Sequence, residues 1–460
     1  MSHPPLDAAY MSLPSQAATA CRRLALLPVK DVDVALAAAV CGGTHADVMD
    51  LLTALADAQL LTRADEQPGR GRVFVYHDEV LAHARATAPP ESKREVVHLA
   101  LEWLIATAST AEQLVTPSHA EFRRTYTAAS QPVPLSFESE PEALAWLESQ
   151  LPNLMTAVRA ATRADLHSCV WQLVHAMWPA WRHFRRYQWW IEAHEAAVRS
   201  AQRCGEHAAG RELLNTLGLG YRHTGEHERA LQAFRDVESM AEKADNTQMT
   251  AQSRHEQGVQ YRELGRYPQS RRRLISARQM RVTAEDLRGV GLTDTELGRL
   301  DLACDDPASA ASRLAKAHQA LAEAGDPYDA ARAKAWWSRA VAQCGDYSES
   351  LRLGKGAHEE FVACRAYMWA ARTVEFLGLN AKEAGLPQEA ANWFRQALAA
   401  YESLRSDSDV LRLRDRLADI TGAAEQLFAT EADFVESSPD RHRGYRALIN
   451  PVDPNRKPTV

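Results

Sequence analysis

A row of cationic and polar side chains recurs in the second half of this 460-residue chain. A guanidinium group matches a carboxylate with two parallel hydrogen bonds, so a surface that displays this row would hold an acidic peptide or protein segment. Acidic residues such as Glu212, Glu263, Glu375 and Glu383 map to the same face and would neutralise part of the row. The predicted partner-binding residues are Asn215, Arg222, His255, Arg262, Arg299, Arg332, Arg339, Arg372 and Lys382.

Tryptophans are concentrated between residues 166 and 205. One interpretation is an aromatic pocket for a ligand or peptide, because aromatic side chains carry much of the energy at recognition sites. The other is that bulky rings fill an irregular core at the end of the repeats. The candidate pocket residues are Trp171, Trp178 and Trp181.

No catalytic or metal-binding constellation is recognisable in the sequence. Its Ser, Cys and Thr residues lie outside known nucleophile motifs, and the seven cysteines are scattered without a C-x-x-C pair. His223 and His227 are four positions apart but have no third ligand. The basic run at 271–273 is expected to be a solvated helix face. We therefore expect a non-enzymatic protein with no cofactor and no metal.

The elements that carry the cationic row repeat at a constant interval of forty positions. Two series of small residues keep this interval, and they are Gly218, Gly258, Gly298, Ser338 and Gly378, then Gly225, Gly265, Asp305, Gly345 and Gly385. A period of this size indicates a solenoid of stacked helical pairs, in which each pair buries its apolar face against its neighbours. The first helix of each pair would line the inner wall, which is why the cations fall on one surface.

The residues of the first copy indicate the type of repeat. Gly218 and Ala230 allow two helices to approach closely, Tyr221 and Phe234 fill the space between them, and Gly225 permits a left-handed turn. This pattern resembles the tetratricopeptide repeat. The usual period of that repeat is about 34 residues, so the resemblance implies longer helices or loops here. HEAT-type pairs have a period nearer to the one seen here but lack the Leu-Gly-x-x-Tyr signature.

Residues 1–90 predict a compact unit of helices and a β-hairpin, the arrangement of a winged helix-turn-helix. Helix starts are expected near Ser15, Asp33 and Thr44, and strands near 60–63 and 72–76. The third helix would be the DNA reader.

That third helix lacks the groups that DNA recognition needs. It carries Asp47, Asp50 and Asp57 and no Lys or Arg, whereas a reading helix needs donors for base edges and cations for phosphates. Arg63, Arg70 and Arg72 in the hairpin are its nearest basic residues, and the net charge of the chain is −7. We therefore favour a protein-docking role for this unit over DNA binding.

The remaining boundaries follow from the loss and return of periodicity. Residues 91–165 are expected to form a helical bridge with a Pro-rich loop, and residues 166–405 a solenoid whose first unit is degenerate. Residues 406–460 are expected to contain a capping helix over 407–428 and a flexible tail. The fold class is thus all-α, a winged-helix domain followed by a tetratricopeptide-like α-solenoid. Without a signal pattern or an apolar run long enough to cross a bilayer, we expect no membrane span and a cytoplasmic location.

The order of these parts resembles the C-terminal half of bacterial STAND regulators, which are signal-transduction NTPases of the NB-ARC type. Besides the repeats, the resemblance rests on Tyr76-His77-Asp78-x-x-Leu81, Ala145-Trp146-Leu147-Glu148 and Asn153-Leu154. In that family a His-Asp pair lies beside the bound nucleotide, so His77 and Asp78 would be a nucleotide-proximal remnant. The chain has no G-x-x-x-x-G-K-[ST] loop, so the NTPase part is lost or supplied by another chain. The alternative is that Asp78 only caps the next helix and that His77 touches nothing.

These features predict a regulatory or adaptor protein that binds a protein or peptide partner, of acidic character, in the groove of its repeats. Two alternatives stay open. One is a transcriptional regulator that binds DNA with the winged helix and senses a signal with the repeats. The other is an accessory subunit of a separate NTPase or biosynthetic enzyme. No oligomeric state is predicted.

Overall fold

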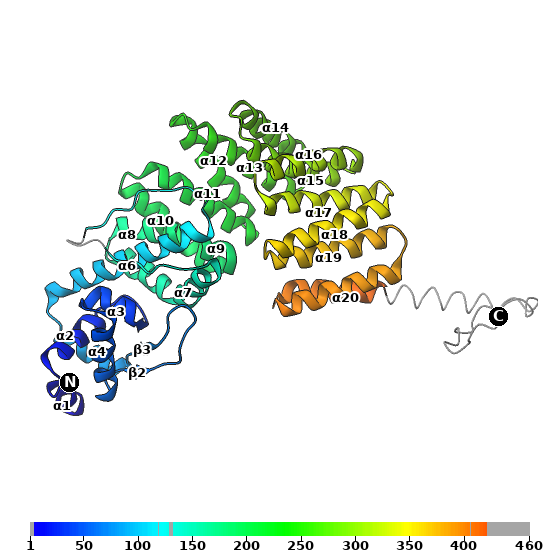
Figure 1. Ribbon diagram of the computed structural model, residues 1–460. Helices are drawn as coiled ribbons and strands as arrows, with labels where there is room; N and C mark the ends of the chain where they lie inside the picture. Colours follow the sequence, from blue (N-terminus) through cyan, green and yellow to red (C-terminus); the bar gives the residue numbers. More distant parts are fainter. Residues whose placement is uncertain (1–3, 118, 128–131, 405, 421–460) are drawn as a thin grey trace, which may run out of the picture. The chain divides into compact units, whose positions relative to one another are not determined.

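The computed structural model describes residues 4–117, 119–127, 132–404 and 406–420 of the chain, and these residues are mainly helical (Figure 1). The chain divides into two compact units, Met1–Leu264 (unit 1) and Gly265–Val460 (unit 2). Within the described ranges, no single helix combines the length and the apolar character of a membrane span, although the bent pair Val34–Cys41 and His45–Asp57 would pass on length and composition alone.

Unit 1 begins with a small domain of helices around a short sheet. Its elements are α1 (Pro4–Met11), α2 (Ser15–Ala25), β1 (Asp31–Asp33), α3 (Val34–Cys41), α4 (His45–Asp57), β2 (Thr62–Arg63), β3 (Val73–Val75) and α5 (Asp78–Thr87). The strands are antiparallel in the order β1-β3-β2. The predicted hairpin is therefore present, and β1 is an additional strand that the sequence did not reveal.

Local capping explains where α3 and α4 begin. The side chain of Asp33 accepts a hydrogen bond from the amide of Leu36 at 2.9 Å. Thr44 and Asp47 form a reciprocal capping box, in which each side chain accepts from the other residue's backbone amide. Both starts agree with the prediction. Helix α2 also starts as expected, but Ser15 is its first helical residue and no side chain caps it.

The bridge consists of two long helices, α6 (Pro90–Val115) and α7 (Glu140–Arg163). Buried amides on α7 join it to the N-terminal sheet. Gln150 Nε2 donates to Asp33 Oδ2 at 2.8 Å, and Asn153 Nδ2 donates to Asp31 Oδ1 at 2.9 Å. The small domain and the bridge consequently share one hydrophobic core.

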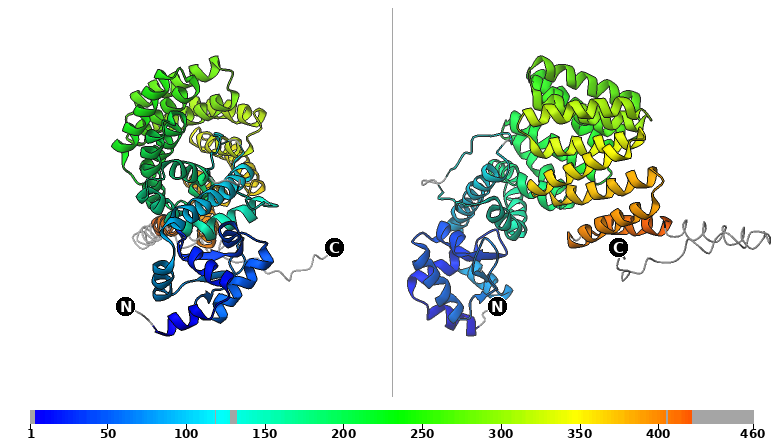
Figure 2. Two further views of the ribbon diagram at one scale, coloured as in Figure 1. Left: turned by 90° about the vertical axis from the view of Figure 1, so that its left-hand side faces the viewer. Right: turned by 45° about the vertical axis from the view of Figure 1, so that its right-hand side comes forward.

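The rest of the described chain is built from consecutive helices. In unit 1 these are α8 (His167–Ala176), α9 (Trp178–Phe184), α10 (Tyr187–Arg203), α11 (His207–His223), α12 (His227–Lys243) and α13 (Thr247–Glu263). In unit 2 they are α14 (Tyr267–Thr283), α15 (Leu287–Ala303), α16 (Pro307–Glu323), α17 (Pro327–Gln343), α18 (Tyr347–Ala363), α19 (Tyr367–Glu383) and α20 (Pro387–Ser403), followed by helical residues 407–420. The right-hand view in Figure 2 shows the helices of unit 2 stacked in chain order.

Equal helix lengths account for the long period. Every helix from α10 to α20 contains 17 residues. The longer helices implied by the 40-residue period are thus present. In the first unit, which the sequence predicts to be degenerate, the first helix is broken into α8 and α9 at Met177, just before Trp178-Pro179.

Apart from this break between α8 and α9, each link from α7 to α20 contains one residue with positive φ. These residues are evenly spaced, and they are Asp165, Arg185, Gly205, Gly225, Asp245, Gly265, Glu285, Asp305, Gly325, Gly345, Arg365 and Gly385. At the Gly225 turn the amide of Glu226 donates back to the carbonyl of Tyr221 at 2.8 Å, which satisfies a carbonyl at the helix end. The 40-residue period therefore contains two successive helix-and-turn units of equal length.

The small residues inside the helices mark close contacts between paired helices. A Cβ atom on Gly218 would lie 2.5 Å from the ring of Phe234, and one on Gly378 would lie 2.4 Å from the ring of Phe394. Ser338 fits in the equivalent place because the residue that faces it is Gly354, on which a Cβ would lie 3.4 Å from the hydroxyl of Ser338. The predicted packing of small residues against aromatic ones is confirmed at both glycines.

Two glycine-to-alanine substitutions in unit 2 should have opposite effects. Gly378→Ala forces a Cβ against Phe394, and overpacking of this kind costs about 1–3 kcal/mol. Gly356→Ala meets only the flexible end of Lys334, so it should gain up to about 1 kcal/mol of helix propensity. Urea denaturation of the two variants measures the change in the free energy of unfolding. Equal changes of the same sign in both variants would contradict the close contact between Gly378 and Phe394.

Candidate functional site

The first helices of the pairs in unit 2 are α15, α17 and α19, and α17 packs against both of the others. We call their shared surface the first-helix wall. It is defined by Glu296, Arg299, Arg332, Trp336, Arg339, Arg372, Phe376, Lys382 and Glu383. The guanidinium of Arg299 lies 4.6 Å from the ring centre of Trp336, whose ring lies 4.7 Å from that of Phe376. A cation and two aromatic rings thus run across all three helices.

Most predicted cations of this wall are paired with carboxylates of the protein itself. Arg299 Nη1 lies 2.7 Å from Glu296 Oε1, and Arg332 Nη2 lies 2.9 Å from Asp329 Oδ1. Arg339 joins α17 to α19, because its two Nη atoms lie 3.0 and 2.6 Å from the carboxylate oxygens of Glu383. It also donates to the buried amide of Asn380. These three arginines therefore already hold acids within the repeats.

Arg372 and Lys382 differ from the other cations of the wall. Both lie on α19 and are exposed. Neither forms an ion pair within 4.0 Å with any residue in the described ranges. The guanidinium of Arg372 lies over the ring of Trp369 at 5.9 Å. These are the two predicted cations of unit 2 that form no ion pair with the described residues.

Glu375, between them on α19, is held from the C-terminal side. Its buried carboxylate accepts from Arg412 Nε and Nη2 at 3.1 and 2.8 Å and from the hydroxyl of Tyr401 at 3.1 Å. Arg412 belongs to the helical segment 407–420. This segment is the described part of the predicted capping helix, and positions 421–428 lie outside the described residues.

The predicted cationic and polar residues of unit 1 lie on α11 and α13. Arg222 Nη1 contacts Glu256 Oε2 at 2.6 Å, and Arg262 Nη2 lies 3.8 Å from Glu263 Oε1. Asn215 and His255 are buried. The Oδ1 atom of Asn215 has no hydrogen-bond partner among the described residues.

The tryptophans of the degenerate unit lie mainly in the core. Trp171 and Trp181 are buried, and the indole of Trp181 donates to the carbonyl of Val174 at 3.1 Å. Trp178 is partly exposed, and the ring of His119 stacks on it at 5.1 Å. The structure therefore does not bring Trp171, Trp178 and Trp181 together as the lining of an open pocket.

A cluster of acid and histidine side chains lies next to Trp178. Glu112 at the end of α6, His119 in the following loop and His175 on α8 offer ligand atoms that all lie within 4.8 Å of one another. Glu112 Oε1 is 2.6 Å from His119 Nδ1 and 3.2 Å from His175 Nδ1. Arg124 Nη2 lies 2.6 Å from the second carboxylate oxygen, Oε2. We call Glu112, His119 and His175 the acid–histidine cluster.

Burial and charge shift the pKa values in this cluster. Burial alone would raise the pKa of Glu112, but hydrogen bonds from His119 and His175 and the charge of Arg124 lower it to about 2. Burial lowers the pKa of His175 to about 4, although Glu112 acts in the opposite direction. Glu112 is therefore an anion and His175 a neutral base at neutral pH.

The sequence alone does not reveal this cluster. Its members come from two helices and a loop, and there is no ligand spacing such as H-x-x-x-H at these positions. The available signal was the pair Glu112 and His119, seven positions apart on either side of a helix end. The three side chains come together only because the loop folds back, so the spacing of residues in the sequence cannot predict the cluster.

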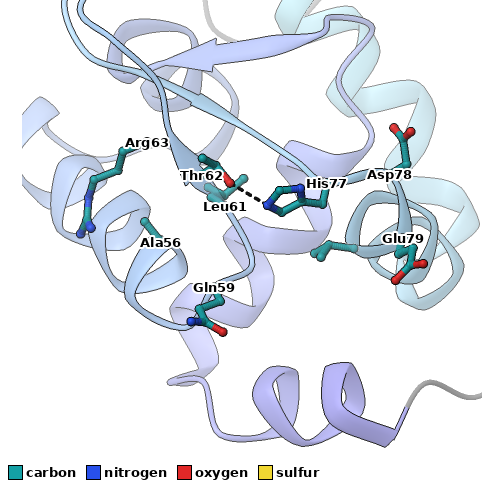
Figure 3. A pocket seen from close by; sticks show the side chains of 9 residues that line it. Ala56, Gln59, Leu61, Thr62, Arg63, His77, Asp78 and Glu79 are labelled. Carbon is teal, nitrogen blue, oxygen red and sulfur yellow. Dashed lines mark hydrogen bonds between the residues drawn. The ribbon is translucent and has the colours of Figure 1, made fainter.

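In the N-terminal domain, an open pocket of about 770 Å³ lies between β2 and the start of α5 (Figure 3). The Nε2 atom of His77 lies 2.8 Å from the hydroxyl of Thr62. Asp78 is the first residue of α5, with His77 at the N-cap position and no side-chain cap. The alternative that Asp78 caps the helix and His77 touches nothing is therefore wrong. His77, Asp78 and Glu79 all line the pocket.

The basic residues of the hairpin are mostly held by acids. Arg70 is buried and lies 2.6 Å from Asp31 Oδ1 and 2.9 Å from Asp33 Oδ2. Arg63 lies 2.6 Å from Asp57 Oδ1. Of the three predicted hairpin cations, Arg72 alone forms no ion pair with the residues that the structure describes.

Comparisons with known proteins give a likeness of fold only. No family model matches the chain, and no curated protein matches it. Among solved structures, a Rap protein complexed with competence and sporulation factor is 11% identical over 62% of this chain and 85% of that chain, with a TM-score of 0.44. Aspartyl phosphate phosphatase F from Bacillus subtilis is 11% identical over 77% and 80% of the two chains, with a TM-score of 0.47.

A STAND protein with a tetratricopeptide repeat sensor from Pyrococcus horikoshii is also similar. It is 12% identical over 93% of this chain and 66% of that chain, with a TM-score of 0.39. These likenesses concern the fold alone. The described helices from α10 to α20 form a tetratricopeptide-like helical solenoid.

The stability of unit 1 should fall as the pH falls from 6.5 towards 4. In that window an unfolded chain takes up protons at His175 and His194, whose pKa values burial lowers in the folded state to about 4 and about 3. Each contributes up to about 1.4 kcal/mol per pH unit. Urea denaturation at pH 7.5 and 5 measures the difference. The variant His175→Gln should reduce this difference in the free energy of unfolding, whereas the control His207→Gln, at an exposed residue, should not. An unchanged difference in His175→Gln would contradict the assignment of the pH dependence to His175.

Proposed function

We propose that this chain is a non-catalytic adaptor or regulator that holds a segment of a protein partner against the first-helix wall. The observation that carries the proposal is the contrast within this wall. Arg299, Arg332 and Arg339 are already paired with acids, whereas Arg372 and Lys382 are exposed and form no ion pair with described residues. Within the first-helix wall, a partner's carboxylate would therefore bind at α19, where the two cations without an internal carboxylate lie.

This distribution also defines the chemistry of the partner. A long acidic segment would have to displace the internal carboxylates, and breaking such half-buried pairs is costly. A short segment with one or two separate carboxylates, such as acidic side chains or a C-terminus, can pair with Arg372 or Lys382, which lie roughly 15 Å apart along α19, while its neighbours contact Trp336. The acidic character expected of the partner is therefore narrowed to one or two carboxylates.

The N-terminal domain, in this proposal, is a winged helix that docks onto protein. Support comes from the antiparallel sheet after α4 and from the acids that hold Arg63 and Arg70. Phosphate contacts need cations that face solvent, and Arg70 is buried. DNA binding by this domain is thus the less supported alternative.

A second candidate function is favoured by the pocket at His77. An open volume of about 770 Å³ lined by Thr62, Arg63, His77 and Asp78 would suit contact with a nucleotide-bound domain of another chain. The chain would then act as an accessory subunit of a separate NTPase. This follows the STAND resemblance in the sequence.

The first proposal predicts a loss of partner binding on charge reversal at α19. In a pull-down from the native cell extract, the double variant Arg372→Glu, Lys382→Glu should recover the partner at least about tenfold less than the wild type, since each charged hydrogen bond is worth about 1.5–3 kcal/mol. Arg395→Glu on α20, which is also exposed, is the matched control. Equal recovery with both variants would exclude the wall as the binding surface.

The second candidate predicts ATP binding only by a pair of chains. Co-purification with an NTPase that binds this chain, followed by a nucleotide-binding assay, should show nucleotide binding by the complex. His77→Ala should weaken this binding without affecting binding of the α19 partner. Nucleotide binding by the NTPase alone at full affinity would remove this candidate.

A further inference from the structure

We propose that the acid–histidine cluster binds one divalent transition-metal ion, and Zn²⁺ is the ion whose preferences it fits best. The ligands would be Glu112 Oε1, His119 Nδ1 and His175 Nδ1. Two imidazoles and one carboxylate form a donor set that suits zinc, with a fourth position left for water. The site is separate from the first-helix wall, so the proposal does not depend on the proposed function.

The distances suit a small tetrahedral ion. Zinc–ligand bonds of about 2.0–2.1 Å place neighbouring ligand atoms roughly 3.3 Å apart. In the structure the carboxylate oxygen Oε1 lies 2.6 Å from His119 Nδ1 and 3.2 Å from His175 Nδ1, and all three ligand atoms lie within 4.8 Å of one another. One of the stacked rings of His119 and His175 must also turn, because a metal lies in the plane of the imidazole that binds it.

Neighbouring groups are arranged as outer-shell partners. The remaining ring nitrogen of His119, Nε2, lies 4.0 Å from the carboxylate of Glu212, and such a carboxylate orients a metal-bound histidine. Arg124 Nη2 donates to Glu112 Oε2, the carboxylate oxygen that is not in the ligand set. The carboxylate of Glu112 offsets the charge of Arg124, whereas burial raises the pKa of Glu212 and favours its neutral form.

Two contacts have to change when the ion binds. His119 Nδ1 gives up the proton that it donates to Glu112 Oε1. Arg124 Nη2, which lies 3.1 Å from His175 Nδ1, moves away from that nitrogen. Arg124 can keep its bond to Glu112 and its bond to Ser109, where Nε lies 3.0 Å from the hydroxyl. The other ring nitrogen of His175, Nε2, is buried without a hydrogen-bond partner among the described residues, so the histidine is not fixed in place by a second bond.

Aromatic rings enclose the cluster. His119 stacks on His175 at 4.4 Å and on Trp178 at 5.1 Å, and Phe122 meets the ring of His175 edge-on at 4.9 Å. Such a shell limits water access and strengthens metal–ligand interactions. An ion bound here would join α6, α8 and the loop residues 119–127, and would hold that loop in place.

The test uses the full-length protein, stripped of metal with a chelator and titrated with Zn²⁺ in a calorimeter. We expect one Zn²⁺ per chain, and tryptic cleavage at Arg123 and Arg124 should slow when Zn²⁺ is added. His119→Ala and His119→Gln should each lower the Zn²⁺ affinity by more than about 100-fold. Both remove a loop side chain and leave the helices intact.

The matched control is His207→Ala, which removes an exposed histidine outside the cluster and should leave the affinity unchanged. Replacing Zn²⁺ by Co²⁺ should give the visible absorption of a tetrahedral site in the wild type and lose it in both His119 variants. Less than about one ion per ten chains, or equal affinity in the wild type and the two His119 variants, would overturn the proposal. Circular dichroism confirms that the variants are folded.

Discussion

The constraint on which the repeats depend is the left-handed residue that follows every helix from α9 to α19. A chain that turns after helices of uniform length, with one αL residue in each short link, repeats the same local geometry at every step. Helices of equal length stay in register when they stack, so equivalent positions of alternate helices fall on one surface. The first-helix wall, its aromatic rings and its two exposed cations all follow from this register.

Arginine in this chain serves mostly to join helices. In unit 2, Asp294 and Asp301 of α15 are contacted by Arg278 and Arg271 of α14 and by Arg313 of α16, at 2.7 to 3.5 Å. Arg271, which the sequence predicted to be solvated, therefore pairs with a buried acid. Pairs in which the arginine stays largely exposed contribute about 0–1 kcal/mol each, so their main effect is to fix which helix faces meet. This pairing also removes most cations from the surface available to a partner.

The sequence predicted the parts of the fold that depend on residue type at fixed spacing. Gly218 against Phe234 and the caps at Asp33 and Thr44 could be recognised because each is a local rule. The break before Trp178 was not predicted, because the helical pattern of the sequence continues through it. The pairing of Arg339 with Glu383 could not, since it depends on how two helices that are distant in the sequence are rotated. The acid–histidine cluster was missed for the same reason, because His119 reaches Glu112 only after the loop folds back. The 20-residue helix-and-turn unit was missed as well. Half of its αL positions are not glycine, so the glycines alone show only the 40-residue period.

The uniform helices also limit how such a chain can change during evolution. One residue inserted within a helix turns everything after it by about 100° around the helix axis. That rotation would turn the apolar stripe of the rest of that helix away from its neighbours, and it would separate the Arg–carboxylate pairs that join residues before the insertion to residues after it. Gain or loss of two consecutive helix-and-turn segments, which make one 40-residue repeat, keeps the later helices on the same faces of the solenoid. Relatives of this chain should therefore differ in how many helices they have, while the length of each helix stays constant.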